Sequence, residues 1–355
     1  MNRFAKSWQS AALTLGIGIA LLFILPGVLD DYTLMQMTIY AVMAILGISL
    51  GFIWGFGGIL CFGQAAFFGL GSYTYAIAVV NLGDSTLPFL LAIVVPALFA
   101  ALLGYVIFYG RLSDVYMGVI TLTVTLILFN LVNSTAGPEW RIGNAPLGGF
   151  NGIPGIPTLN VPGQPDEVLG PVALFSLTFS CLLVVYLILR VLISSKIGRV
   201  MVAAKENEQR VLLGYDARAY KLFCFTLGGA IAGLAGCLFA NWGAFTSPTI
   251  FGLAMSAQII IWVIVGGLGT LVGPVIGCIL IQWISTEIGT QQTFNSNLVL
   301  GAILVTFVLL VPRGIVPSLG DAIDAAVRRL RRAPTAGDTP AATPAPAQVA
   351  TERGA

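Results

Sequence analysis

The fold is decided by stretches such as Pro88 to Gly110, which reads PFLLAIVVPALFAALLGYVIFYG and contains no charged residue. A helix of about twenty consecutive apolar residues is long enough to cross the hydrocarbon core of a bilayer. In lipid, every backbone polar group must find a partner within the protein, and a helix satisfies this requirement by itself. The stretch therefore predicts a transmembrane helix.

Composition extends this prediction to the whole chain. Of its 355 residues, 57% are apolar and only 9% are charged, and the mean hydropathy is +0.94. A soluble domain carries about 25% charged residues, so this chain has too few to cover a surface that faces water. Its composition excludes a soluble globular enzyme, a disordered regulator and a nucleic-acid-binding protein.

The residue types also limit the chemistry. The sequence has no histidine, which removes the usual metal ligand and the usual catalytic base. Its five cysteines lie in apolar runs without a C-x-x-C spacing, so we interpret them as apolar filler. We expect no catalytic residue, no metal and no cofactor.

We predict an all-α polytopic transmembrane helical bundle of about 8–10 spans. Because several stretches are short or interrupted by glycine, eight or nine full crossings plus a re-entrant segment is the alternative to ten crossings. Arg3 and Lys6 precede the first stretch as in a signal peptide, but no small-x-small cleavage site follows, so we expect a retained helix. The ten candidates are 11–29, 33–53, 60–81, 88–110, 115–133, 171–193, 222–243, 254–270, 273–289 and 298–312.

The distribution of basic residues predicts the orientation. If both termini are cytoplasmic, the outer connections between the ten spans hold a single basic residue, Arg141. The inner side then holds Arg3, Lys6, Arg111, Arg313, the C-terminal arginines and all basic residues from 190 to 221. Cytoplasmic loops carry an excess of Lys and Arg, so this asymmetry predicts a cytoplasmic location for both termini.

Ionisable residues are almost absent from the predicted spans. Glu287 is the only carboxylate clearly within one, and it lies near the outer end. Transporters coupled to protons or sodium usually place charged groups near the midplane of the bilayer. A secondary transporter is thus disfavoured, although backbone carbonyls can bind sodium, and an energy source outside this chain is the simpler interpretation.

Neutral polar residues at membrane depth are the candidates for a translocation path. Thr121 and Thr125 share one helical face. Each candidate has the alternative of a hydrogen bond to a neighbouring helix or, for threonine, to its own backbone. The candidates are Gln64, Thr121, Thr125, Asn130 and Gln258.

Glycines recur in the apolar stretches at a spacing of four residues. Examples are Gly229 with Gly233, and Gly269 with Gly273 and Gly277. Small residues at this spacing let helix backbones approach closely in lipid, so we interpret them as packing sites rather than as substrate contacts. The pairs Gly57-Gly58 and Gly266-Gly267 are candidates for broken helices beside the pathway.

The loop 194–221 is the most polar inner segment of the main body. The residues from Val200 to Leu213 predict one helix, with Gly214 as its C-terminal cap. Two interpretations stay open from the residues alone: a solvated connecting helix, or a short helix that docks in a groove of a cytoplasmic partner.

Two further segments flank the transmembrane domain, to which we assign residues 1–318. The outer loop 134–170 is dense in glycine and proline, and its core PLGGFNGIP places Gly149, Phe150 and Asn151 at the tip. We expect the glycines and prolines of this loop to fix turns and Phe150 to be offered at the tip; a passive ordered connection is the alternative. At the other end, 319–332 predicts an interfacial amphipathic helix that binds membrane lipid, and 333–355 predicts a disordered tail.

Five separated blocks resemble one family of membrane proteins. The longest, 194–240, reads SSKIGRVMVAAKENEQRVLLGYDARAYKLFCFTLGGAIAGLAGCLFA. It resembles the cytoplasmic loop and following helix of bacterial permeases for branched-chain amino acids of the LivM-like type, and of the related urea and short-chain amide permeases. The other four are 53–73, 114–131, 263–281 and 308–316, in the family's order.

The resemblance implies a permease subunit of an ATP-binding-cassette importer in the bacterial inner membrane. Its expected partners are a homologous sister permease, two cytoplasmic ATPase subunits and a periplasmic substrate-binding protein. The loop would then couple to the ATPase through Ala204, Lys205, Glu206, Asn207, Glu208 and Gly214. Consistently, the sequence contains no G-x-x-x-x-G-K-[ST] motif with which to hold ATP itself.

The sequence says less about the substrate. A pathway with few charges suits a small solute without a large net charge, such as a zwitterionic amino acid or a neutral amide. The block PLGGFNGIPGI resembles the amino acid permeases more than the urea permeases, which favours leucine, isoleucine or valine. The alternatives are a urea or short-chain amide importer and a self-contained channel for urea-like solutes.

Overall fold

A computed structural model describes residues 2–110, 114–137, 139–161, 164–290, 301 and 314–319. The predicted span 298–312, interfacial helix 319–332 and tail 333–355 lie outside this part of the chain, apart from residues 301 and 319.

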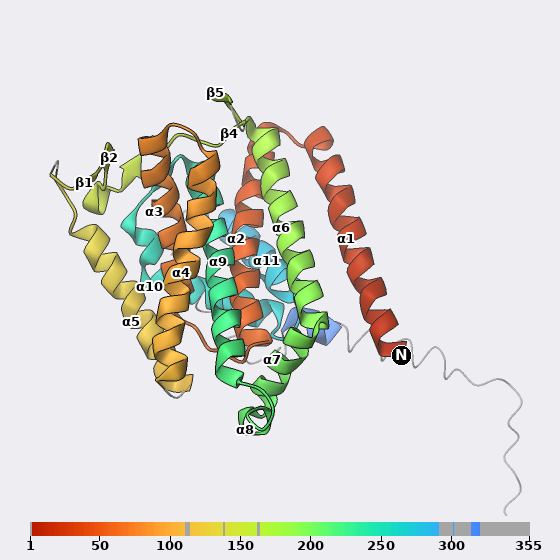
Figure 1. The fold of residues 1–355 in the computed structure, drawn as a ribbon. Coiled ribbons are helices and arrows are strands. Elements are labelled where there is room, and N and C mark those ends of the chain that lie inside the picture. Colours follow the sequence, from red (N-terminus) through yellow and green to blue (C-terminus); the bar gives the residue numbers. More distant parts are fainter. Residues whose placement is uncertain are drawn as a thin grey trace, which may run out of the picture. The chain divides into compact units, whose positions relative to one another are not determined.

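The described chain is a bundle of α-helices (Figure 1), which confirms the predicted fold class. The first nine predicted spans each coincide with a helix. These helices are α1 (Asn2–Val28), α2 (Asp31–Gly55), α3 (Gln64–Leu82), α4 (Thr86–Tyr109), α5 (Asp114–Asn133), α6 (Pro171–Ser194), α9 (Ala217–Gly243), α10 (Leu253–Gly266) and α11 (Val272–Thr290).

Six of these helices are long and apolar enough to cross a membrane, namely α2, α3, α4, α5, α6 and α9. The apolar parts of α1, α10 and α11 are shorter. At about 1.5 Å per residue, α10 reaches only about 21 Å, less than the core of a bilayer. Its length therefore favours the re-entrant alternative for this segment over a full crossing.

The polar parts of the chain gather at the two ends of the bundle (Figure 1). At one end lie the short helices α7 (Lys196–Glu206) and α8 (Glu208–Val211). The other end carries the outer loop, which forms the 3-10 helix η1 (Gly149–Asn151) and five short strands. They are β1 (Arg141–Ile142), β2 (Ala145–Pro146), β3 (Ile153–Pro154), β4 (Asn160–Val161) and β5 (Gln164–Val168). After α9 come β6 (Phe245–Thr246) and the 3-10 helix η2 (Pro248–Phe251). The strands pair antiparallel as β1 with β2, β3 with β6, and β4 with β5.

Helix α9 is the central helix and packs against α2, α3 and α4. Its small residues make this close packing possible, as predicted. A side chain at Gly229 would meet Ala100 on α4, and one at Gly236 would meet the backbone of Phe68 on α3. Because small residues bring backbones together where lipid supplies no hydrophobic driving force, α9 forms the core around which the others are placed.

Two glycine pairs end helices, as the sequence predicts. Helix α2 stops at Gly55, and α3 starts only at Gln64, so the predicted span 60–81 begins four residues too early. Helix α10 stops at Gly266, and Gly267 and Gly269 adopt positive φ values of 109° and 83° before α11 begins. We call residues 56–63 the α2–α3 break and residues 267–271 the α10–α11 break.

Candidate coupling loop, interior polar groups and outer loop

The inner loop is two helices rather than the single helix predicted from Val200 to Leu213. Ser195 begins α7 by accepting a hydrogen bond from the Gly198 N–H, at 3.4 Å. Asn207 then leaves the helix with φ −157° and ψ 95°, and its side chain accepts from the Arg210 N–H at 3.1 Å. An asparagine that caps a new helix competes with continuation of the old one, so the prediction of one helix was wrong.

Gly214 does not have the predicted capping geometry. Helix α8 ends at Val211. Gly214 lies in the turn that follows, where its N–H donates to the Val211 carbonyl at 3.1 Å, and its φ is not positive. It is instead one of the residues that line a groove on this loop.

The groove lies between α7 and α8 and has a volume of about 530 Å³. Glu206 and Asn207, two of the predicted coupling residues, are exposed and line it together with Gly214. A concave surface that combines charged and apolar side chains suits contact with a partner. The full lining is Arg199, Val200, Ala203, Glu206, Asn207, Arg210, Val211, Gly214 and Tyr215.

The other predicted coupling residues make contacts within this chain, although Lys205 is itself an exposed residue. Ala204 is buried with Val211 and Ala217 in a small apolar cluster that holds α7, α8 and the start of α9 together. Lys205 donates from Nζ to the Gly55 carbonyl of α2 at 2.8 Å.

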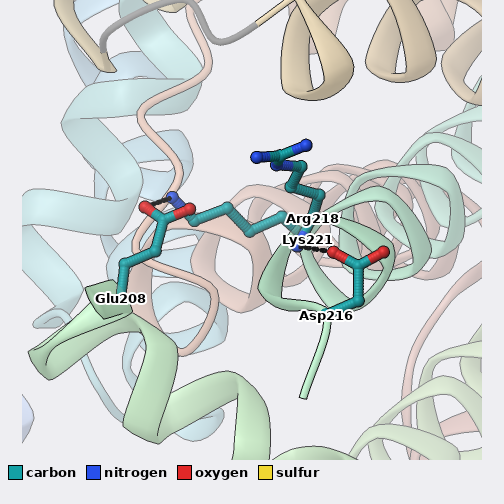
Figure 2. Close-up of polar contacts among 4 residues, drawn as sticks. All are labelled: Glu208, Asp216, Arg218 and Lys221. Atoms are coloured by element: carbon teal, nitrogen blue, oxygen red, sulfur yellow. Dashed lines mark hydrogen bonds and ion pairs between the residues drawn. The ribbon is translucent and has the colours of Figure 1, made fainter. Parts of the chain in front are cut away.

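Glu208 forms an ion pair with Lys221 of α9, with 2.7 Å between Oε2 and Nζ (Figure 2). The lysine side chain is 12% exposed and the glutamate side chain 41%. In the same view, Asp216 caps α9 by accepting from the Arg218 backbone N–H at 3.1 Å. This ion pair links α8 to α9 and fixes the shape of the loop. The Glu208 carboxylate is therefore already paired within this chain.

Gln64 is the first residue of α3 and is buried. Its Nε2 donates to Ser49 Oγ at 2.7 Å and to the Gly228 carbonyl at 3.1 Å. Its Oε1 is buried without a hydrogen-bond partner among the described groups. The side chain thus joins α2, α3 and α9, which is the interhelical alternative considered for this candidate.

Thr121 and Thr125 of α5 are also buried, on the face turned towards the bundle. Thr125 Oγ1 donates to the Thr121 carbonyl at 2.8 Å. Thr121 Oγ1 donates to the Gly118 carbonyl at 3.0 Å and accepts from the Phe62 N–H at 3.2 Å. Both hydroxyls are therefore used by backbone groups, as in the alternative interpretation for threonine.

The remaining two pathway candidates lie elsewhere. Asn130 is exposed on the opposite side of α5, with Nδ2 donating to the Leu126 carbonyl at 2.9 Å. Gln258 is half-buried on α10. Among the described residues, neither the α7–α8 groove nor a second groove of about 600 Å³ between α4 and α6 is lined by any of the five candidates.

The tip of the outer loop is ordered by glycine. Gly148, Gly149 and Gly152 have φ values of 69°, 52° and 73°, which residues with a Cβ adopt only at a cost. Gly149 is buried, Asn151 is exposed, and Phe150 is 64% exposed. The glycines thus form the turns of this tip, and the Phe150 ring lies at the surface. That the loop contacts a partner stays a prediction.

Three asparagines that the sequence analysis missed tie this loop to the bundle. Asn81 donates to the Ile142 carbonyl and accepts from the Asn144 N–H, at 2.8 and 2.7 Å. Asn241 accepts from the Leu159 N–H at 2.8 Å, and Asn160 accepts from the Ser85 N–H at 2.9 Å. Asn81 and Asn241 each lie near the outer end of an apolar helix, a position that could have marked them.

Asn160 also orders the acidic residue at the start of α4. Its Nδ2 donates to Asp84 Oδ1 at 3.1 Å. This hydrogen bond stabilises the ionised form, so the pKa of Asp84 lies below its usual value. The outer loop is thus fixed to α3, α4 and α9 by directed polar contacts.

Comparison with known proteins gives this arrangement a family. Residues 32–308 match the family model described as the permease component of branched-chain amino acid transport systems. Two relatives are high-affinity branched-chain amino acid transport system permease proteins LivM. The Escherichia coli K12 protein is 28% identical over 297 residues, and the Salmonella typhimurium LT2 protein is 30% identical over 298. Each alignment covers 79% of this chain and 69% of the relative. No solved structure matches the chain significantly.

Proposed function

The chain belongs to the family of branched-chain amino acid transport permease components, and we propose that it forms the transmembrane pathway of an importer driven by separate ATPase subunits. It is a multi-pass protein of the bacterial inner membrane and a transport component rather than an enzyme. The observation that carries the proposal is the α7–α8 groove, because it lies on the polar inner loop of a chain that matches this family over 32–308.

We assign the groove to the ATPase. Glu206 and Asn207 offer an exposed carboxylate and amide, and Arg199 and Arg210 offer two positive charges in a groove that also has apolar lining residues. The α7–α8 segment seated in a cleft of the ATPase would bury apolar surface and pair charges at once, which is the usual way in which helices are bound. Two ATPase subunits, one for each permease, complete the inner side of the importer.

We assign the outer loop to a substrate-binding protein. Phe150, Trp140 and Ile142 are exposed apolar side chains at this end, with 64%, 48% and 51% of their surfaces accessible. Exposed apolar groups on one loop are candidates for a contact site. Because three asparagines hold the loop in place, a binding protein would meet a preformed surface and lose little entropy on docking.

The pathway itself is expected to form between this chain and a homologous sister permease. Helix α5 is the least buried of the six long apolar helices. Its outer face carries Thr123 and Asn130, whose side chains donate to carbonyls four residues earlier. Two such faces opposite each other would line a path with neutral polar groups.

The proposed substrates are leucine, isoleucine and valine. The two relatives are named for branched-chain amino acid transport, and a path lined by neutral groups suits a zwitterion with an aliphatic side chain. A fixed charge at depth would instead bind one end of the zwitterion too strongly for release.

Reconstitution in liposomes tests the proposal. The chain, its sister permease and the ATPases should import radiolabelled leucine only when ATP and the binding protein are both present. Leucine flux through the chain alone would reveal a channel and overturn the proposal. A binding protein that binds urea in calorimetry and does not bind leucine would overturn the substrate assignment.

A further inference from the structure

The α2–α3 break is closed by hydrogen bonds that double back on the last turn of α2. The Gly57 N–H donates to the Phe52 carbonyl, the Gly58 N–H to that of Trp54, and the Ile59 N–H to that of Ile53. In a continuous helix, the Ile59 N–H would bond to the Gly55 carbonyl. The turn at the break leaves the Gly55 carbonyl without this backbone donor.

Lys205 of α7 supplies the missing donor. Its Nζ lies 2.8 Å from the Gly55 oxygen, at the negative end of the helix dipole of α2, where a cation is favoured. A hydrogen bond from a charged donor contributes more than one between neutral groups. The ammonium group therefore caps α2 from a different segment of the chain, 150 residues away in the sequence.

The α2–α3 break also packs closely against α7 and α9. Gly58 has a φ of 69°, and a Cβ there would lie 2.8 Å from Lys205 Cγ. A Cβ on Gly57 would lie 2.7 Å from Cys224 Sγ of α9. The α2–α3 break thus contacts α7 of the inner loop and α9, which follows the loop.

The other end of the break leads to α5 and to the interior. The Phe62 N–H donates to Thr121 Oγ1 at 3.2 Å, and a Cβ on Gly63 would lie 2.8 Å from Thr121 Cβ. Gln64 begins α3 directly afterwards. A Cβ on Gly55 would lie 2.9 Å from the Gly269 N of the α10–α11 break. The α10–α11 break and α5 are therefore both within contact distance of the α2–α3 break, which Lys205 caps.

We infer that Lys205 is a positioning residue that transmits movement of α7 to the α2–α3 break. This inference rests on the proposed function. When the ATPases close and displace α7, the ammonium group is withdrawn from the Gly55 carbonyl, and the break is free to change shape. The change reaches the buried face of α5 through Phe62 and Thr121, and a shift of this helix would also move its opposite face, which is assigned to the pathway.

Lys205→Met and Lys205→Arg separate the charged donor from the packing of the stem. Methionine keeps an unbranched apolar stem and removes the ammonium, whereas arginine keeps a donor with a positive charge. In the reconstituted importer, we expect Lys205→Met to lower leucine import per ATP hydrolysed by about tenfold, the effect of losing one charge-assisted hydrogen bond. Lys205→Arg should restore most of this ratio.

Lys196→Met is the matched control, since Lys196 is an exposed lysine at the other end of α7. It should leave the ratio unchanged. Equal ratios for wild type and Lys205→Met would overturn the inference, as would an equal defect in Lys205→Met and Lys205→Arg. The proposed function fails in a different way, because the wild-type complex would then show no import that depends on ATP.

A measurement on the wild-type complex applies even if Lys205→Met does not assemble. Hydrogen–deuterium exchange reports the amides of residues 56–59, which are bonded to α2 in the state described here. Trapping the ATPases with ATP and vanadate should raise the exchange rate of these amides relative to those in the middle of α2. Unchanged exchange at 56–59 in the trapped complex would overturn the inference.

Discussion

Two neighbouring glutamates on the inner loop have different surroundings, although the sequence gives no reason to separate them. Glu206 is the last residue of α7 and lines the exposed groove. Glu208 begins α8 and pairs with Lys221 of α9. Asn207 lies between them and ends one helix while starting the next, so it turns the two carboxylates towards different neighbours.

Charge reversal should therefore act differently at these two positions. Glu206→Lys should abolish stimulation of the ATPase by binding protein and substrate while leaving the melting temperature of the purified permease unchanged, because the side chain is exposed. Glu208→Lys should lower stability by at most about 1 kcal/mol, since the pair with Lys221 is partly exposed. ATPase assays and thermal unfolding measure the two effects.

Two control variants make this prediction specific. Gln209→Lys changes charge on an exposed residue of α8 outside the groove, and it should leave stimulation intact. The double variant Glu208→Lys with Lys221→Glu re-forms the ion pair and should recover stability. If Glu206→Lys stimulates normally, the groove is not the contact with the ATPase.

At the scale of elements, the sequence predicted helices better than their interruptions. The apolar runs located nine helices because the length and composition that a bilayer requires leave few alternatives. The split at Asn207 was missed because the residues on both sides, VAAKE and EQRV, favour helix. The hydrogen bond from the Arg210 N–H to the Asn207 side chain favours two helices over one. The periodicity of apolar residues does not show such competition between a side chain and the backbone.

The candidate site was predicted in outline for a similar reason. The residue types identified the inner loop and the outer loop as functional segments, but contacts decide which side chains are available. Lys205 and Glu208 are used within the chain because α2 and α9 lie beside the loop. The contact of Lys205 with Gly55, 150 residues away, depends on the packing of the whole bundle.

The outer loop offers a test of order at the scale of an element. Gly152 and Gly155 both have positive φ, at 73° and 66°. A Cβ on Gly152 would collide with the Thr246 carbonyl beside the β3–β6 pair, whereas nothing lies within 4 Å of one on Gly155. Gly152→Ala should displace the loop and reduce import about tenfold or more, because it adds a clash to about 1–2 kcal/mol of backbone strain.

Gly155→Ala is the control for that variant, since it introduces similar strain without the clash. It should retain import at close to the wild-type level. Uptake of leucine through the reconstituted importer, at saturating and subsaturating binding protein, measures both variants. Equal behaviour of the two would show that the order of the loop tip does not matter for docking.

At the scale of the molecule, the described chain has polar segments at both ends of an apolar bundle, and four of its five pathway candidates divide into two sets. Gln258, half-buried on α10, belongs to neither. Gln64, Thr121 and Thr125 are buried inside this chain. Asn130 is exposed on α5. A subunit that shares its pathway with a sister permease needs exposed polar groups such as Asn130, because the path then lies outside each single bundle.

Accessibility of cysteines in the assembled importer tests where the path lies. In a chain whose five native cysteines are replaced by alanine, Asn130→Cys should react with a charged thiol reagent, and the reaction should stop import. Thr125→Cys is buried on the opposite face of the same helix and should not react. Leu98→Cys on α4, a site that is 65% exposed in the apolar body, is the control for a residue that faces lipid.

A thiol reacts as its thiolate, which forms in water and not in hydrocarbon, so a fast reaction at residue 130 requires a water-filled path along α5. A rate at Asn130→Cys no faster than at Leu98→Cys would place the outer face of α5 against lipid and move the pathway to another face of the bundle.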